Sequence, residues 1–107
     1  MFFPSVTPAT NRVEVIQRAV LSYHPNLRMA DIKSSRRDAK VVRPRQIAMY
    51  LCKVLTMKSL PDIGRRFGGR DHTTVLHAIN KIAGLIETDP KLAAQVNAIK
   101  DFLGESV

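Results

Sequence analysis

The sequence predicts an all-α fold, a small bundle of about six helices, on three observations. Apolar residues recur at three- and four-residue spacings along most of the chain. Capping residues, glycines and prolines divide this pattern into separate segments. No segment shows the sustained alternation of apolar and polar residues that marks a half-buried strand. A chain of 107 residues can form one domain with its own core.

The first predicted helix begins near Asn11, a candidate N-cap, and ends before Pro25. Residues 1–10 hold two prolines and no charge, so we expect a flexible tail there, with a packed arm as the alternative. The folded domain is therefore expected to span residues 11–107.

A polar stretch separates the first helices from the next long one. Residues 29–32 can form one further turn before this stretch begins. Pro44 suits the first turn of the following helix, because proline lacks the N–H that this position leaves unbonded. The apolar stripe of that helix consists of Ile47, Tyr50, Leu51, Val54 and Leu55.

Three further helices follow, each with its own start signal. Ser59 and Asp62 resemble a capping box at the start of a short helix that ends at Gly68-Gly69. Asp71 then caps a longer helix, whose inner face consists of Val75, Leu76, Ile79, Ile82 and Ile86. Asp89-Pro90 opens the last helix, whose inward residues are Leu92, Val96, Ile99 and Leu103.

The positive charge of the chain is concentrated in one block. The whole sequence has 17 basic and 9 acidic residues, a net charge of +8. Between Lys33 and Arg70 there are eleven basic residues and only two acidic ones, Asp38 and Asp62. A solvated helix face normally mixes signs, so this block indicates a polyanionic partner. Much of it lies in a polar stretch rather than on an amphipathic helix, which favours nucleic acid over a membrane surface.

The predicted helices over 59–67 and 71–87, joined by a tight glycine turn, have the spacing of a helix-turn-helix. An ordinary helical hairpin has the same spacing. The run Arg70–Thr74 favours the first interpretation, because these side chains suit base edges in a major groove. Asp71 can equally be a plain N-cap, and Thr74 can be half-buried.

The basic stretch 34–45 is either a solvated loop or an arm that follows DNA. In the second case Arg36 and Arg37 are the candidates for insertion into a minor groove, where narrow A·T tracts concentrate negative potential. Arg43 and Arg45, which flank a proline at a predicted helix start, suit phosphate contacts instead.

Backbone amides of Ser59 and Leu60 can also bind phosphate, since they lie at a helix start, although simple capping explains Ser59 as well.

Catalytic and cofactor sites have no support in the sequence. The single cysteine, Cys52, allows no internal disulfide and is predicted to be a small core residue, which fits a reducing cytosol. His72 and His77 are five residues apart, on different helix faces, and there is no CxxC, so we expect no metal. The glycines fit no phosphate-binding loop. We expect no enzyme, no cofactor, no membrane span and no secretory signal.

The segments VRPRQIAMYLCK and SLPDIGRRFGGRDHTTVLHA resemble the C-terminal DNA-binding domain of the bacterial chromosomal replication initiator family, DnaA. The motif GGRDHTTVLHA is specific to that family. The likeness is strong over residues 32–78 and extends by helix pattern alone over 11–103. It implies a six-helix domain whose helix-turn-helix reads DnaA boxes in the major groove while the basic loop reaches the adjacent minor groove.

The resemblance also implies roles for individual residues. Base contacts would come from Arg37, Asp71, His72, Thr73 and Thr74. With Arg36 added from the basic loop, the contacts at or near the DNA backbone would be Arg36, Arg43, Arg45, Lys53, Ser59, Leu60, Pro61, Arg70 and His77.

Two departures from the family limit what transfers. The family's ATPase and N-terminal interaction domains have no counterpart in the sequence, so box recognition transfers and ATP-driven assembly does not. Asp38 and Ala39 stand where more polar or basic residues are expected, and an acid beside the inserting arginine should weaken phosphate contact.

The leading hypothesis is a free-standing domain that binds double-stranded DNA at DnaA-box-like sites and modulates replication initiation or transcription by occupancy. We expect a monomer, because one box imposes no twofold symmetry, and a cytoplasmic, nucleoid-associated location. One alternative is an adaptor that binds a protein such as the replication initiator. Another is an excised part of a full initiator, against which the Met1 start argues.

Overall fold

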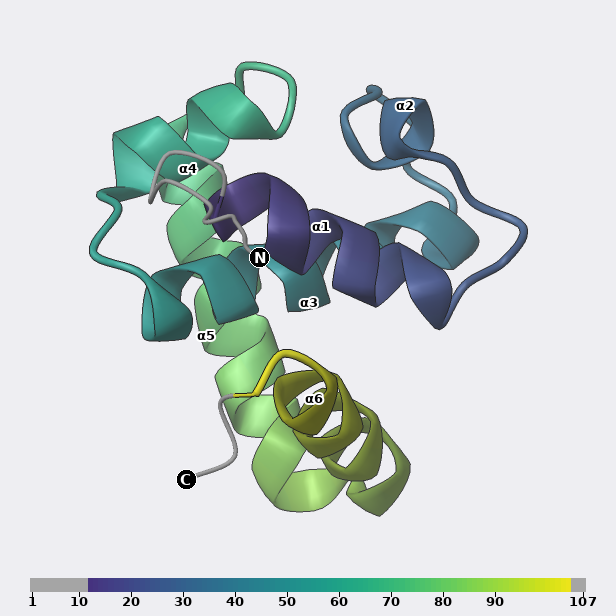
Figure 1. Cartoon of the computed structure of the whole chain (residues 1–107). Helices are drawn as coiled ribbons and strands as arrows, with labels where there is room; N and C mark the ends of the chain where they lie inside the picture. The colour runs from purple at the N-terminus through teal and green to yellow at the C-terminus, as the bar shows by residue number, and fades with distance from the viewer. Residues whose placement is uncertain (1–11, 105–107) are drawn as a thin grey trace, which may run out of the picture.

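The structure, a computed structural model, describes residues 12–104 and confirms the all-α prediction. Six helices run through this part of the chain (Figure 1). They are α1 (Arg12–Ser22), α2 (Met29–Ile32), α3 (Ala39–Leu55), α4 (Leu60–Arg66), α5 (His72–Thr88) and α6 (Pro90–Phe102). The predicted tail over 1–10 and the predicted Asn11 cap lie outside the described residues.

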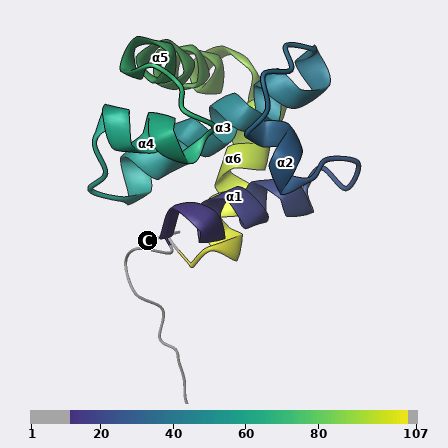
Figure 2. The same ribbon diagram turned by 90° about the horizontal axis from the view of Figure 1, so that it is seen from above.

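Helix α3 lies at the centre of the fold. It contacts α1, α2, α4 and α5, while α5 packs against α4 on one side and α6 on the other (Figures 1 and 2). The core is apolar and contains Phe67, Ile16, Ile47, Leu51, Ile82 and Ile99 among its fully buried side chains. Burial of this apolar surface is the main force that holds the helices together.

The one buried amide of α1 joins it to the end of α4. Gln17 is 2% exposed, and its Nε2 donates to the carbonyl of Arg66 at 2.9 Å. This bond satisfies a carbonyl at the end of α4, where the helix itself supplies no partner. The bond helps to fix the short helix α4 on the rest of the bundle.

The predicted caps are largely confirmed. Asp89 accepts hydrogen bonds from the N–H groups of Lys91 and Leu92, and Pro90 opens α6 as expected. Ser59 accepts from the N–H of Asp62 at 3.2 Å. The reciprocal half of the predicted capping box does not form between side chain and backbone, because the Asp62 carboxylate faces the basic residues of the same region instead.

Helix α3 begins earlier than predicted. Its first residue is Ala39, so Pro44 lies inside the helix and not in its first turn. The helix gains a buried Val41 from this extension. Pro44 removes the bond to the Lys40 carbonyl, but Lys40 is exposed, so water can take that place.

Two residues that were predicted to lie on the inner faces of their helices are exposed to solvent. Leu76 is 41% exposed and Val54 is 46% exposed. On α5 the buried positions are Val75, Ala78 and Ile82, so the next residue, Leu76, is turned about 100° away from that stripe. The stripe on α3 is likewise offset from Val54, since it is centred on Ile47, Ala48, Leu51 and Cys52.

Candidate nucleic-acid interface

The turn between α4 and α5 has the geometry predicted for a helix-turn-helix. Gly68 and Gly69 adopt φ values of 89° and 80°, in the left-handed region that favours glycine. The carbonyl of Gly64 accepts from the N–H groups of Gly69 at 3.0 Å and Arg70 at 2.8 Å. A β-carbon on Gly64 would collide with the Arg70 carbonyl, so the close approach of the two segments requires glycine there.

The first turn of α5 exposes a continuous polar edge. The four predicted base contacts, Asp71 to Thr74, are all exposed, and Thr74 is not half-buried. The Asp71 carboxylate accepts from the Thr73 N–H at 3.2 Å and lies 3.5 Å from Nδ1 of His72. Asp71 therefore serves as the N-cap, and its exposed oxygen edge remains available to solvent. His77, one turn further along, is exposed as well.

The basic loop, residues 33–38 between α2 and α3, returns to the same end of the molecule as the turn. The Arg70 guanidinium donates to the carbonyl of Ser34. A β-carbon on Gly68 would collide with the carbonyl of Lys33. The fold thus brings the basic loop and the start of α5 together, although they are more than 30 positions apart in the sequence.

Arg45, a predicted phosphate contact, has an internal position in the fold. It is 6% exposed, and its guanidinium donates to the carbonyls of Ile32 at 2.9 Å, Ser34 at 3.0 Å and Asp31 at 3.3 Å. Burial lowers the pKa of Arg45, and the charge of Arg70 lowers it further. The side chain holds the segment that leads into the basic loop.

The two candidates for minor-groove insertion differ in their partners. Arg36 pairs with Asp38 through two hydrogen bonds of 3.1 and 2.9 Å and with Asp31 at 3.3 Å. The hydrogen bond from Arg36 is the main reason why the pKa of Asp38 is lowered. Arg37 is exposed and makes no ion pair or hydrogen bond with another described residue. Of the two, Arg37 is the one whose donors are not used by any other residue that the structure describes.

The remaining predicted backbone contacts are spread over α3 and the start of α4. Lys53 and Pro61 are exposed, and Leu60 is half-buried. Ser59 is exposed, and its hydroxyl acts as the α4 cap, so the capping role is the one realised in the fold. Arg43 is half-buried, with Nη1 enclosed and without a hydrogen-bond partner among the described residues.

One carboxylate, that of Asp62, pairs with three cations in and just before α4. Asp62 lies 2.9 Å from Arg65, 3.3 Å from Arg66 and 3.8 Å from Lys58. Burial opposes ionisation of Asp62, but hydrogen bonding from Arg66 and the surrounding charges lower its pKa overall. The charge block seen in the sequence is therefore partly neutralised within the fold.

A protein family described as "Bacterial dnaA protein helix-turn-helix" matches residues 13–82. This match covers α1 to α4, the basic loop, the turn and the first part of α5. The chain belongs to this family. The resemblance inferred from the sequence motifs is thereby confirmed, together with the helix-turn-helix.

Chromosomal replication initiator proteins DnaA are similar to the chain over most of its length. The protein from Rhodopseudomonas palustris strain HaA2 is 56% identical over 98 residues, which is 92% of this chain and 21% of the relative. That from Xanthobacter autotrophicus is 58% identical over 93 residues, 87% of this chain and 18% of the relative. The chain spans about a fifth of the length of the DnaA relatives it matches.

Sequence reasoning missed two residues that shape this DnaA-type turn. Gly64 was assigned no role, although a lone glycine inside a helical pattern is a signal of close backbone approach. Gln17 was also missed, and here no signal was present, since its partner is a main-chain carbonyl 49 positions away. No helix among residues 12–104 is long and apolar enough to cross a membrane.

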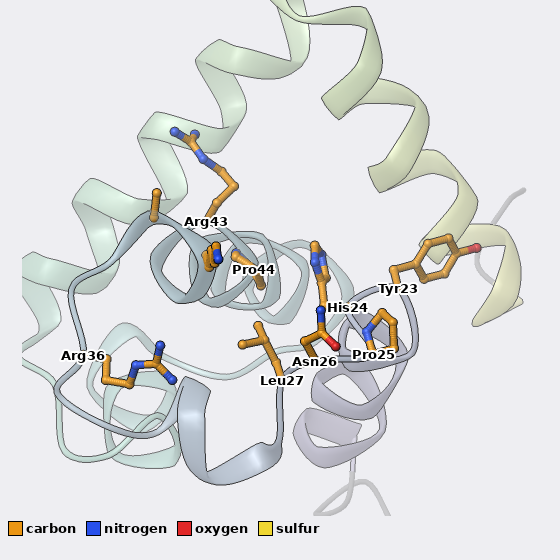
Figure 3. Close-up of a pocket in the computed structure, with 10 residues that line it drawn as sticks. Tyr23, His24, Pro25, Asn26, Leu27, Arg36, Arg43 and Pro44 are labelled. Atoms are coloured by element: carbon orange, nitrogen blue, oxygen red, sulfur yellow. The ribbon is translucent and has the colours of Figure 1, made fainter.

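A pocket of about 420 Å³ was not predicted either. It lies between the α1–α2 connection, the basic loop and the first turns of α3 (Figure 3). Leu27 and Pro44 line it with apolar surface, and Arg36 extends toward it from the basic loop. Its α3 residues (Ala39, Lys40, Arg43 and Pro44) lie about 140° around the helix from those that line the smaller hollow beside α5 (Val42, Arg45, Gln46 and Met49).

Proposed function

We propose that this domain binds double-stranded DNA at DnaA-box-like sites and reads both grooves. The first turn of α5 would enter the major groove with Asp71, His72, Thr73 and Thr74, and Arg37 would enter the adjacent minor groove. The observation that carries the proposal is that an exposed polar helix start lies at the same end of the molecule as Arg37, which has no hydrogen-bond or ion-pair partner among residues 12–104. Membership of the DnaA helix-turn-helix family supports it independently.

Phosphate contacts would supply most of the affinity. Of the proposed contacts with the DNA backbone, Lys53, Pro61 and His77 are exposed. The other proposed backbone contacts are Ser59, Leu60, Arg36, Arg43 and Arg70. Contacts of this type hold the protein in register and carry no sequence information of their own. Arg45 has one guanidinium nitrogen, Nη1, with no recorded hydrogen bond to a described residue, so its contribution to the backbone would be secondary to its internal one.

The proposed outcome is modulation of replication initiation or transcription by occupancy alone. The match to the family's helix-turn-helix supports a binding role without ATP hydrolysis. Such a protein would work at the bacterial nucleoid as a monomer, because a single box requires no twofold partner. An ATP hydrolysis assay on the purified chain should give no protein-dependent rate, and sedimentation should give one mass with and without a single-box duplex.

The specific-readout proposal is tested by binding to a box duplex and a scrambled duplex at two salt concentrations. Thr73→Ala should reduce the preference for the box, because one base contact is worth about 1–3 kcal/mol. Thr88→Ala is the matched control, since Thr88 is exposed on the same helix at its opposite end. Equal affinity of the unaltered protein for both duplexes would refute specific readout.

A second candidate function is an adaptor that binds an acidic segment of a protein partner such as the replication initiator. The pocket favours it, because its lining combines apolar residues such as Leu27 and Pro44 with three basic residues, Arg36, Lys40 and Arg43. A concave apolar floor suits a side chain better than a phosphate backbone. Lys40→Glu should then abolish binding of the initiator and leave box preference intact, and equal loss of both would refute the adaptor.

A further inference from the structure

Two guanidinium groups from different elements meet at one carbonyl of the basic loop. Arg45, on α3, donates Nη2 to the Ser34 oxygen at 3.0 Å, and Arg70, at the end of the helix-turn-helix turn, donates to the same oxygen. A carbonyl oxygen has two lone pairs and can accept both bonds. Ser34 is therefore held from the helix below the loop and from the turn beside it.

The turn end of this connection is itself rigid. The Arg70 N–H is bonded to the Gly64 carbonyl, and the next residue, Asp71, caps α5. Gly68, in the same turn, packs against the Lys33 carbonyl so closely that a β-carbon would not fit. The start of α5 and the entry to the basic loop thus touch through both side chain and backbone.

The basic loop is also constrained by hydrogen bonds and ion pairs, up to the residue before Arg37. The Ser34 hydroxyl donates to the Asp31 carbonyl at 2.6 Å and accepts from the Arg36 N–H at 3.2 Å. The Arg36 side chain is fixed on Asp31 and Asp38. Arg37 is the residue that projects from this ordered frame without a bond to another described residue.

We propose that Arg70 is a positioning residue, which acts through the Ser34 carbonyl to hold the basic loop so that Arg37 stands at a fixed offset from the first turn of α5. This inference rests on the proposed function and deepens it. Because the loop is already ordered in the free protein, the free energy of binding does not include the entropic cost of ordering it. The competing interpretation is that Arg70 is only a phosphate contact.

Burial supports the positioning role over a simple phosphate contact. Arg70 is half-buried, its Nε is enclosed without a hydrogen-bond partner among the described residues, and one of its terminal nitrogens is committed to Ser34. It also lies near like charges, because the charge of Arg37 acts on Arg70 and that of Arg70 acts on Arg45. A side chain that served phosphate alone would be more exposed, as Lys53 is.

The first experiment uses the free protein and needs no DNA. Arg70→Met keeps the stem of the side chain and removes the guanidinium, and amide hydrogen exchange of residues 33–38 is compared with wild type. Arg18→Ala is the control, because Arg18 is an exposed arginine paired with Glu14 on α1. We expect faster exchange in the loop of Arg70→Met alone, with the helices unchanged. Loop exchange equal to that of the control would overturn the proposal.

The second experiment separates positioning from phosphate contact on DNA. Two duplexes are used that differ by A·T or G·C pairs in the minor-groove part of the site. Arg37→Ala and Arg70→Met should each reduce the preference for A·T roughly tenfold, in the range of one base contact, and the double variant should lose little further preference. Equal weakening of both duplexes by Arg70→Met, with the A·T preference kept, would show a phosphate contact and overturn positioning.

The two experiments fail differently. If wild type binds neither duplex, the proposed function is wrong, and the exchange experiment still decides whether Arg70 orders the loop. If wild type binds with an A·T preference and Arg70→Met leaves both that preference and the loop exchange unchanged, only the positioning role is wrong. Circular dichroism of each variant verifies that comparisons are made on folded protein.

Discussion

Gly64 and Gly84 offer a matched pair of substitutions with opposite expected effects. Both glycines lie inside helices, α4 and α5, so replacement by alanine gains helix propensity of about 0.5–1 kcal/mol in each case. A β-carbon on Gly84 meets nothing within 4 Å. Gly84→Ala should therefore raise the free energy of unfolding by about that amount.

Gly64→Ala has the same gain but meets the main chain. Its β-carbon would collide with the carbonyl group of Arg70 and lie 3.4 Å from Cγ2 of Val75. A backbone carbonyl cannot move aside as a side chain can, so overpacking of about 1–3 kcal/mol is expected and outweighs the propensity. The displaced turn would also weaken the bonds from Gly69 and Arg70 to the Gly64 carbonyl, which are 3.0 and 2.8 Å long.

Thermal unfolding followed by circular dichroism measures both variants. Their difference of a few kcal/mol should separate the two midpoints by on the order of 10 °C, with Gly84→Ala above wild type and Gly64→Ala below it. Well below its midpoint, Gly64→Ala should also lose box preference, because the start of α5 is displaced. A Gly64→Ala midpoint equal to or above that of wild type would refute the close-approach argument.

Three further predictions concern charge. Asp38→Asn removes the nearer of the two carboxylates that hold Arg36, so it should raise affinity for any duplex and steepen the slope of log K against log salt by at most about one, whereas an unchanged slope would contradict this. Arg37→Ala should cost A·T preference and Arg36→Ala should not, as competition between the two duplexes would measure. Burial lowers the pKa of His24, so the unfolded chain binds the proton more readily than the folded protein does. The free energy of unfolding should therefore fall as the pH drops below 6.5. In denaturant titrations, His24→Gln should remove the part of this fall that is due to His24.

The sequence predicted helices and turns well where the signal is local. Asp89-Pro90, Ser59 and the Gly68-Gly69 turn act through neighbours within a few positions, and all three appear as expected. The start of α3 was placed wrongly because Pro44 is such a strong local signal that it concealed the helix preceding it. Exposure of Leu76 and Val54 depends on which neighbours cover each helix, which spacing alone does not state.

The candidate site was predictable as a list of residues and not as an arrangement. The polar run at the start of α5 was read directly from the sequence, and it is exposed as a unit. The internal hydrogen bonds of Arg45 were not predicted, because they depend on its position four residues after Val41, on the buried side of α3. The pairing of Arg36 with both Asp31 and Asp38 depends on the fold of the loop, which composition does not encode.

The two hydrogen bonds that the Ser34 carbonyl accepts affect which spacing of base pairs the protein can read in a DNA site. Arg45 and Arg70 connect the basic loop to the same frame as α5, so we expect the distance between the two proposed sets of groove contacts to be fixed. One inserted base pair between the A·T tract and the major-groove half would shift the tract by about 3.4 Å and rotate it by about 35°. The protein could then contact only one half of the site at a time. The spacing between the two halves would therefore determine binding as strongly as the identity of the bases does.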